Sequence, residues 1–323
     1  MIDELTLVLR PILGDDVVVE NLRPLTGGAS RITFAFDAVT GTTRRPLILR
    51  TAPTAEGQFA SMELEAAAQS AAAQAGAPVP NILTASNSPA ALGNPYLICD
   101  EIAGETIVRK IARQLDDAGR SRLLTQCGQA LAAIHRAATD AAELRERDEL
   151  VEWRQRLDEL DDTTATFEWA FRWLEANRPD PGPRTLTHGD FRMGNLIVDG
   201  SAVPVRLAAV LDWEAVHIGD IHEDLAWFCV RAWRFGAPPS MAAGGLGSVE
   251  DLVSAYERAG GAAVDRDALR WWLVLGTLKW GIICRYQAER HLSGQTRSVE
   301  LAAIGRRVCE NEWDILDLLG QAS

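Results

Sequence analysis

The stretch 188-HGDFRMGNLIVD-199 sets several polar side chains beside an apolar, strand-forming run. Within it Asp190 is followed, after four residues, by Asn195, and the later apolar run LAAVL leads directly into Asp212. Phosphoryl transfer needs a carboxylate that orients an attacking hydroxyl and accepts its proton, together with oxygen ligands that hold Mg²⁺ on nucleotide phosphates. Asp190 has the chemistry of the first group, and Asn195 and Asp212 have the chemistry of the second.

The same spacing occurs in the catalytic loop of protein kinases, where a His-Arg pair precedes the Asp and a metal-binding Asn follows it. A His-Gly-Asp triplet by itself would more simply be a turn with a capping Asp. Here the triplet beginning at His188 is joined by Asn195, by a spacer of strand length and by Asp212. That combination favours the catalytic interpretation.

The pattern around the motif divides the chain into two parts. Upstream we predict strands over 32–38, 47–50 and 96–101, and an Ala-rich helix over 62–75. Downstream the apolar spacing is helical, with helices expected over 151–176, 223–233, 251–259, 267–290 and 298–319. The one β-rich interruption expected there is 195–198 with 207–211. We therefore predict an α+β protein with an N-lobe at 1–98, a hinge at 99–104 and a helical C-lobe at 105–323.

Composition limits the classes of partner. The chain has 323 residues and a formal net charge of -13, so a role that depends on a basic face, such as nucleic-acid binding, is not expected. Its 32 basic residues include only two lysines, Lys110 and Lys279, so charge-based chemistry must depend mainly on arginine.

Localisation follows from the cysteines and the apolar segments. The five cysteines are scattered without a CxxC pair, which indicates free thiols in a reducing compartment. The first residues carry acids where a signal peptide would be basic, and the apolar segment 271–284 contains Lys279 and is short for a membrane span. We expect a cytoplasmic protein without a membrane partner; oligomeric state is left open.

The segments 188-HGDFRMGNLIVD-199 and 210-VLDWEAVHIGDIHEDLAW-227 resemble the aminoglycoside phosphotransferase-like kinases, closest to the subgroup related to the kinase-like domain of acyl-CoA dehydrogenases. The resemblance extends through 25-LTGGASRITFAF-36, 47-LILR-50, 76-GAPVPNIL-83 and 92-LGNPYLICDEIAG-104. It implies a protein-kinase-like bilobal fold, with a small β-rich N-lobe that binds nucleotide and a larger helical C-lobe.

The resemblance also implies roles for individual residues. Asp190 looks like the catalytic base, with Asn195 and Asp212 as Mg²⁺ ligands. Arg192 occupies the place where related kinases direct a cation toward the transferred phosphoryl group. His188 is expected to support the loop through hydrogen bonds.

Three residues near the motif have less definite roles. Glu214 and Asp220 could contact metal or substrate, or be structural. Asp224 is expected to be an acceptor that holds the loop.

On the nucleotide side, kinases hold the α and β phosphates with a strand lysine that pairs with a helix Glu. The matching position here is Arg50, and an arginine is common there in the related subgroup. Arginine can bind phosphate with two parallel hydrogen bonds. Its partner is predicted to be Glu65, with Glu63 as the alternative. A solvent-exposed arginine at a strand end is the competing interpretation of Arg50.

Two backbone segments complete the predicted nucleotide site. The turn 26-TGGASR-31, with Gly27, Gly28 and Ser30, could place N–H groups over the phosphates, although a glycine pair between strands usually marks a hairpin. Adenine would lie at the hinge against the main chain of Asp100 to Ile102.

The resulting hypothesis is a kinase that uses Mg²⁺ and ATP to phosphorylate the hydroxyl of a small molecule. The subgroup suggests a hydroxy acid or a hydroxyacyl thioester as acceptor, and the wider family an aminoglycoside or another amino alcohol. A catalytically inactive, nucleotide-binding regulator is the alternative of another class. The resemblance implies an acceptor pocket in the helical lobe. Five residues are equal candidates for its lining: Trp227, Arg231, Trp272, Trp280 and Arg285.

Overall fold

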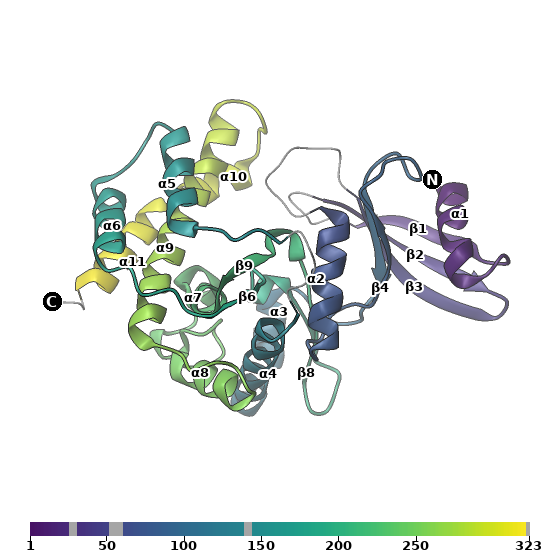
Figure 1. Ribbon diagram of the computed structural model, residues 1–323, viewed down its shortest axis with the longest axis horizontal. Helices are drawn as coiled ribbons and strands as arrows, with labels where there is room; N and C mark the ends of the chain where they lie inside the picture. Colours follow the sequence, from purple (N-terminus) through teal and green to yellow (C-terminus); the bar gives the residue numbers. More distant parts are fainter. Residues whose placement is uncertain (26–30, 52–60, 139–143, 321–323) are drawn as a thin grey trace.

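The N-lobe is built on a five-stranded antiparallel sheet in the order β1-β2-β3-β5-β4, at the right of Figure 1. Its strands are β1 (Val18–Leu25), β2 (Ile32–Thr40), β3 (Thr43–Thr51), β4 (Ile82–Ser86) and β5 (Tyr96–Asp100). The computed structural model describes residues 1–25, 31–51, 61–138 and 144–320.

Different helices cover the two faces of this sheet, because side chains alternate along each strand. Leu47 of β3 is buried in the cluster that includes the apolar side of α1 (Ile2–Leu13). The next residue, Ile48, packs on the opposite face against α2 (Met62–Gln74). Arg50 has the same orientation as Ile48, so the strand directs its guanidinium toward α2.

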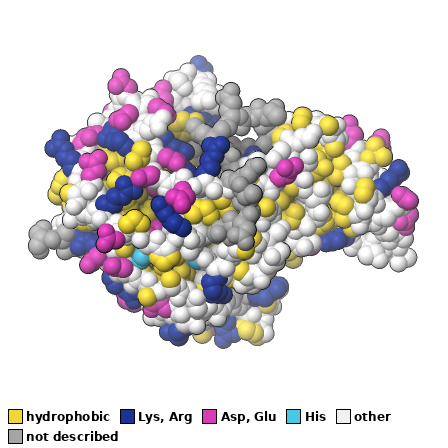
Figure 2. All heavy atoms as spheres, in the orientation of Figure 1, with side chains coloured by type: hydrophobic (Ala, Val, Ile, Leu, Met, Phe, Trp, Pro, Cys, Tyr) yellow, Lys and Arg dark blue, Asp and Glu magenta, His cyan; other side chains and the backbone are white. Residues whose placement is uncertain are grey.

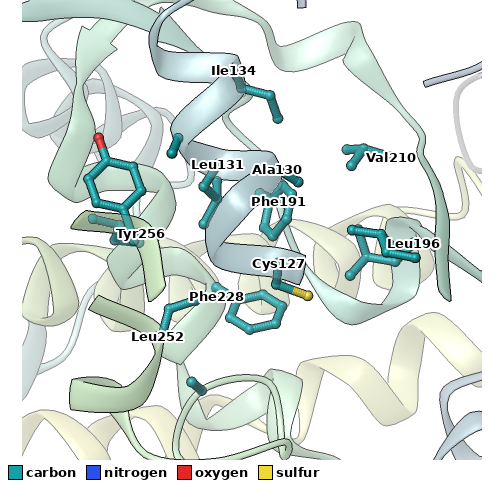
Figure 3. Close-up of a cluster of buried hydrophobic side chains, with 14 of the residues drawn as sticks. Cys127, Ala130, Leu131, Ile134, Phe191, Leu196, Val210, Phe228, Leu252 and Tyr256 are labelled. Carbon is teal, nitrogen blue, oxygen red and sulfur yellow. The ribbon is translucent and has the colours of Figure 1, made fainter. Parts of the chain in front are cut away.

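The C-lobe is mainly helical and surrounds the central helix α4. Its helices are α3 (Val108–Gln114), α4 (Asp117–His135), α5 (Glu149–Glu159), α6 (Ala165–Ala176), α7 (Ile221–Cys229), α8 (Val249–Arg258), α9 (Arg266–Leu292), α10 (Val299–Gly305) and α11 (Val308–Gly320). Figure 3 shows how Phe191 of the motif loop and Phe228 of α7 lie beside Leu131 of α4 in its core. The motif loop is thus attached to the largest apolar cluster.

Two short strand pairs position the motif within this lobe. They are β6 (Arg184–Thr187) with β9 (His217–Asp220), and β7 (Leu196–Asp199) with β8 (Arg206–Val210). Residues 188–195 connect β6 to β7, and residues 211–216 connect β8 to β9. The two connections meet where the Leu211 N–H donates to the Asn195 carbonyl at 2.8 Å.

The predicted α+β architecture of two unequal lobes is confirmed, while three details of the prediction are wrong. The helix expected over 151–176 is two helices, because Thr164 caps a new one by accepting the N–H of Phe167. The helix expected over 298–319 is likewise divided into α10 and α11. The pair β6–β9 adds a second β-rich segment to the C-lobe, since four-residue strands leave little periodic signal.

None of the described helices combines the length and the hydropathy needed to cross a bilayer. Cysteines 99, 127, 229 and 284 are buried free thiols, and Cys309 is an exposed one. The prediction of unpaired cysteines is therefore confirmed for all five.

Candidate active site

The buried helix α7 holds the motif loop through one carboxylate. Asp224 is fully buried, and its two oxygens accept the N–H groups of His188 and Gly189 at 2.8 and 2.9 Å. His135 of α4 donates to the same carboxylate at 3.2 Å. Burial acts to raise the pKa of Asp224, but the hydrogen bonds and charge of these donors outweigh it and lower the pKa. The expectation that Asp224 is an acceptor that holds the loop is confirmed.

His188 links the two connections of the strand pairs. Its Nε2–H donates to the Leu211 carbonyl at 3.0 Å, and its Nδ1 accepts the Asp190 N–H at 3.2 Å. Its ring also lies 4.8 Å from the ring of Trp213. Because both ring nitrogens are engaged, His188 can orient the loop but has no ring nitrogen left for a substrate.

Three donors converge on the carboxylate of Asp190. They are Arg192 Nε at 3.0 and 3.2 Å, Asn195 Nδ2 at 2.7 Å and Trp227 Nε1 at 2.7 Å. The side chain is still 26% exposed, so a substrate hydroxyl can reach it. The guanidinium of Arg192 lies 4.8 Å above the ring of Trp233. Trp233 was not predicted for the site, since no motif marks it.

Asn195 and Asp212 lie on the side of the loop that faces the N-lobe. The Asn195 amide nitrogen is used by the side chain and carbonyl of Asp190, which leaves its oxygen available. Asp212 has left-handed backbone angles (φ 69°, ψ 66°), which are costly for a residue other than glycine and concentrate at functional sites. Its side chain is 34% exposed. An amide oxygen and an accessible carboxylate are ligands that suit Mg²⁺.

Arg50 bridges the two lobes. Its guanidinium donates to Glu65 of α2 at 3.1 Å and to Asp212 at 2.8 Å. Arg31 contacts Glu65 as well and lies 3.5 Å from Glu214. Burial raises the pKa of Glu65 in spite of these cations. A cluster of cations and carboxylates therefore crosses from the sheet to the motif loop, and the role of Arg31 in it was not predicted.

Three further predictions concern the nucleotide side: the alternative partner Glu63, the hinge backbone and the glycine turn. Glu63 points away from Arg50 and bonds the side chain of Asn87 at 3.0 Å. The N–H groups of Asp100 and Glu101 are donated to the carbonyls of Asn81 and Pro46, whereas the N–H of Ile102 has no acceptor among the described residues. The turn residues 27, 28 and 30 lie outside the described residues.

A buried ionic cluster lies directly behind the motif loop. Lys279 Nζ is 3.0 Å from Glu149, 3.7 Å from Glu223 and 3.5 Å from the Gly189 carbonyl. His217 completes it with a 3.0 Å contact to Glu223. Glu149, His217 and Glu223 could be taken for a metal site, but the ammonium of Lys279 already supplies the positive charge among them. The sequence feature that marks this cluster is Lys279, a lysine within an otherwise apolar stretch of α9.

Of the five residues considered for the acceptor pocket, Trp227 belongs to the site through its bond to Asp190. Arg231 and Arg285 are paired with the carboxylates of Asp314 and Asp162. Trp280 packs on Trp233, whereas Trp272 lies against Trp271, beside a separate pocket.

Asp220 caps α7 by accepting the His222 N–H at 2.9 Å, which is a structural role.

A five-stranded lobe over a helical lobe, with Asp, Asn and Asp side chains gathered between them, defines a phosphotransferase of the protein-kinase-like class. The chain belongs to the phosphotransferase enzyme family, whose model matches residues 21–272. The expected resemblance and fold are both confirmed.

Relatives of known sequence point to the same subgroup. Acyl-CoA dehydrogenase family member 10 of Mus musculus is 25% identical over 292 residues, which is 84% of this chain and 27% of that protein. The human family member 11 is 25% identical over 239 residues, or 69% of this chain and 30% of that protein. The chain thus spans less than a third of the length of these relatives.

Solved structures agree in fold. A Ralstonia eutropha protein described as a candidate aminoglycoside phosphotransferase superposes with a TM-score of 0.77 at 18% identity, covering 98% of both chains. The complex of APH(2")-IIIa with GDP and kanamycin gives a TM-score of 0.64 at 14% identity and covers 96% of this chain and 98% of that one. At these identities the likeness establishes the fold alone.

Proposed function

We propose that this protein is an ATP-dependent kinase, assisted by Mg²⁺, that transfers the γ-phosphoryl group to the hydroxyl of a small molecule. The observation that carries the proposal is the geometry around Asp190. Its carboxylate is accessible and is oriented by Arg192, Asn195 and Trp227. A general base must be both oriented and within reach of the hydroxyl proton.

Each neighbouring group has a matching task. Asp190 accepts the proton as the hydroxyl oxygen attacks phosphorus, and Arg192 faces the charge that develops on the transferred group. Asn195 and Asp212 would hold Mg²⁺, which neutralises the phosphates when it is bound. Arg50, fixed by Glu65, would bind the α and β phosphates in place of the usual lysine.

For the acceptor we propose a hydroxy acid or a hydroxyacyl thioester, because the curated relatives are acyl-CoA dehydrogenase family members. An aminoglycoside or another amino alcohol is the second candidate, since the kanamycin complex shares the fold. An inactive nucleotide-binding regulator is disfavoured by the intact geometry of Asp190, Asn195 and Asp212.

The test is a mass-spectrometric screen with Mg·ATP of hydroxy acids, hydroxyacyl thioesters, aminoglycosides and amino alcohols. We expect one class to gain the mass of a phosphoryl group. Asp190→Asn should reduce that transfer by about 10²–10⁴-fold while leaving nucleotide affinity nearly unchanged, because only the proton acceptor is lost. Nucleotide binding without phosphorylation of any class would favour the regulator, and an active Asp190→Asn variant would remove Asp190 from its role.

A further inference from the structure

A second pocket, of about 510 Å³, borders the motif loop on the side of α3. Arg109, Arg113 and Arg120 line it from α3 and the start of α4, and Arg234 lines it from the segment that follows α7. Met193, which directly follows Arg192, is part of its wall. We call this space the arginine pocket.

The arginine pocket is positively charged in a protein whose net charge is -13. Its described lining contains four arginines and no Asp or Glu. Another pocket, between α5 and α9, shows the usual compensation, with the arginines 147, 178 and 184 beside the carboxylates of residues 146, 148, 149 and 220. The arginine pocket differs from it in having no carboxylate in its described lining.

Arg234 carries a buried nitrogen that an anionic ligand would satisfy. Its Nε is buried and has no hydrogen-bond partner among the described residues, although the residue as a whole is partly exposed and Asp314 interacts with its charge. Burial, reinforced by repulsion from Arg231, lowers the pKa of Arg234. A buried N–H without an acceptor is costly, because it has lost its water and gained no hydrogen bond in exchange.

Arg109 and Arg113 are available for the same ligand, whereas Arg120 is already engaged. Arg109 and Arg113 are exposed and have no ion pair with a described residue, while Arg120 is shared between Asp117 and the Ala112 carbonyl. Planar guanidinium groups recognise phosphate and carboxylate oxygens through paired hydrogen bonds. The pocket therefore has the chemistry of an anion site.

The pocket also adjoins the reacting groups. Met193 joins it to the loop that carries Asp190, and Trp233, which precedes Arg234, holds the guanidinium of Arg192 against its ring. We propose that the arginine pocket binds an anionic group of the acceptor, a phosphate or a carboxylate, so that its hydroxyl end is presented to Asp190. This inference rests on the proposed kinase function and favours an anionic acceptor over a polycationic aminoglycoside.

Calorimetric titration tests the inference. Inorganic phosphate, pyrophosphate and succinate are titrated separately into protein saturated with Mg²⁺ and a non-hydrolysable ATP analogue, so that Arg50 and the nucleotide site are already occupied. We expect one equivalent of anion to bind. Preference for the phosphates or for succinate identifies which kind of anionic group the pocket takes.

Substitutions locate the site. Arg109→Gln with Arg113→Gln, both at exposed positions, should weaken anion binding about tenfold or more, since hydrogen bonds to charged groups are lost. Arg234→Gln should do the same. The matched control is Arg122→Gln, an exposed position of α4 outside the pocket, which should bind as the parent does.

Two results would overturn the inference: no binding of any of the three anions, or binding that both pocket variants retain. The proposed function fails separately, if the ATP analogue itself does not bind. In that case the same titrations are made without nucleotide in an Arg50→Gln background, and the difference between the pocket variants and Arg122→Gln still decides whether the arginine pocket is an anion site.

Discussion

At the scale of the residue, the motif contains a position, Gly189, that a residue with a side chain cannot occupy without strain. Gly189 has a φ of +78°, and a Cβ atom built there would lie 2.6 Å from the Ala215 carbonyl oxygen. Gly41, in the β2–β3 turn, has a φ of +57° but open space around it. The two positions thus share the backbone strain and differ in the steric clash.

We predict that Gly41→Ala lowers the free energy of unfolding by about 1–2 kcal/mol, the cost of a left-handed alanine. Gly189→Ala should cost more and should also abolish phosphotransfer, because relief of the clash moves the neighbouring Asp190. Urea denaturation and the acceptor assay measure the two effects. Equal destabilisation by both substitutions would contradict the assigned clash.

At the scale of the element, α9 supports the motif loop through Lys279. This lysine is among the most enclosed cations of the C-lobe, with a side chain 11% exposed, and it neutralises Glu149 and Glu223. Its ammonium also lies 4.9 Å above the ring of Trp227, the residue that donates to Asp190. Charge balance in the core and the orientation of the Asp190 carboxylate are therefore linked through Trp227.

Lys279→Met should destabilise the protein by about 3 kcal/mol, because removing one cation from the buried cluster leaves Glu149 and Glu223 with only partial compensation from Arg147 and His217. Combining it with Glu149→Gln should recover part of the loss. Chemical denaturation of the two single variants and the double variant measures the coupling. Strict additivity of the two substitutions would show that the pair does not interact.

Strand β9 contributes a pH-dependent element to the same cluster. Burial acts to lower the pKa of His217, but the charge and hydrogen bond of Glu223, with the charge of Glu149, raise it to about 9. In the unfolded chain the value is near 6.5. The protonated histidine therefore contributes stability that is fully present below pH 6.5 and is lost as the pH rises through 9.

We predict that the parent loses on the order of 3 kcal/mol relative to His217→Gln between pH 6 and pH 10, from 1.36 kcal/mol for each pKa unit. Unfolding free energies of both proteins across this range give the measurement. Parallel pH curves for parent and variant would rule out the assigned pKa. Protonation of His217 would then contribute nothing to the free energy of unfolding.

At the scale of the whole molecule, ion pairs between charged side chains link the two lobes. On the proposed function, a bound nucleotide would rearrange these pairs. Arg50 joins Glu65 in the N-lobe to Asp212 in the C-lobe, and Arg31 reaches both Glu65 and Glu214. Elsewhere, charges of both signs are interspersed over the face of the helical lobe seen in Figure 2.

We expect Mg·ATP to stabilise the protein by about 2.7 kcal/mol at a concentration of one hundred times its dissociation constant, by mass action. EDTA should remove most of this shift, and Asp212→Asn should reduce the part that depends on Mg²⁺. Thermal denaturation with ATP, with Mg·ATP and with added EDTA separates these contributions. A shift of the same size with and without Mg²⁺ would exclude the metal role of Asp212.

Particular elements show how far the fold was predictable. The helix α2 and the strands β2 and β5 were predicted to within two residues at each end, whereas the prediction for β3 covered only residues 47–50 of Thr43–Thr51. The strand pair β6–β9 and the break between α5 and α6 were missed, because a four-residue strand and a single capping threonine give weak local signals. The first helix, α1, was not predicted, although its apolar positions cover one face of the sheet.

The site divides in the same way. Asp190, Asn195 and Asp212 were named from their spacing, and Arg50 with Glu65 from a resemblance; their catalytic roles stay predictions. Trp233, Lys279 and Arg31 were missed. Their contacts join segments that are far apart in the chain, and no spacing rule records such contacts.

The sequence alone determined the class of chemistry and the two-lobed architecture, because local periodicity and the spacing of a few polar residues suffice for both. Only the tertiary structure decided what surrounds the motif. It placed Lys279 behind the loop, Trp227 and Trp233 beside its charged groups, and a pocket lined by four arginines next to it. Burial and charge balance depend on which distant segments meet in space, so they exist only once the chain has folded.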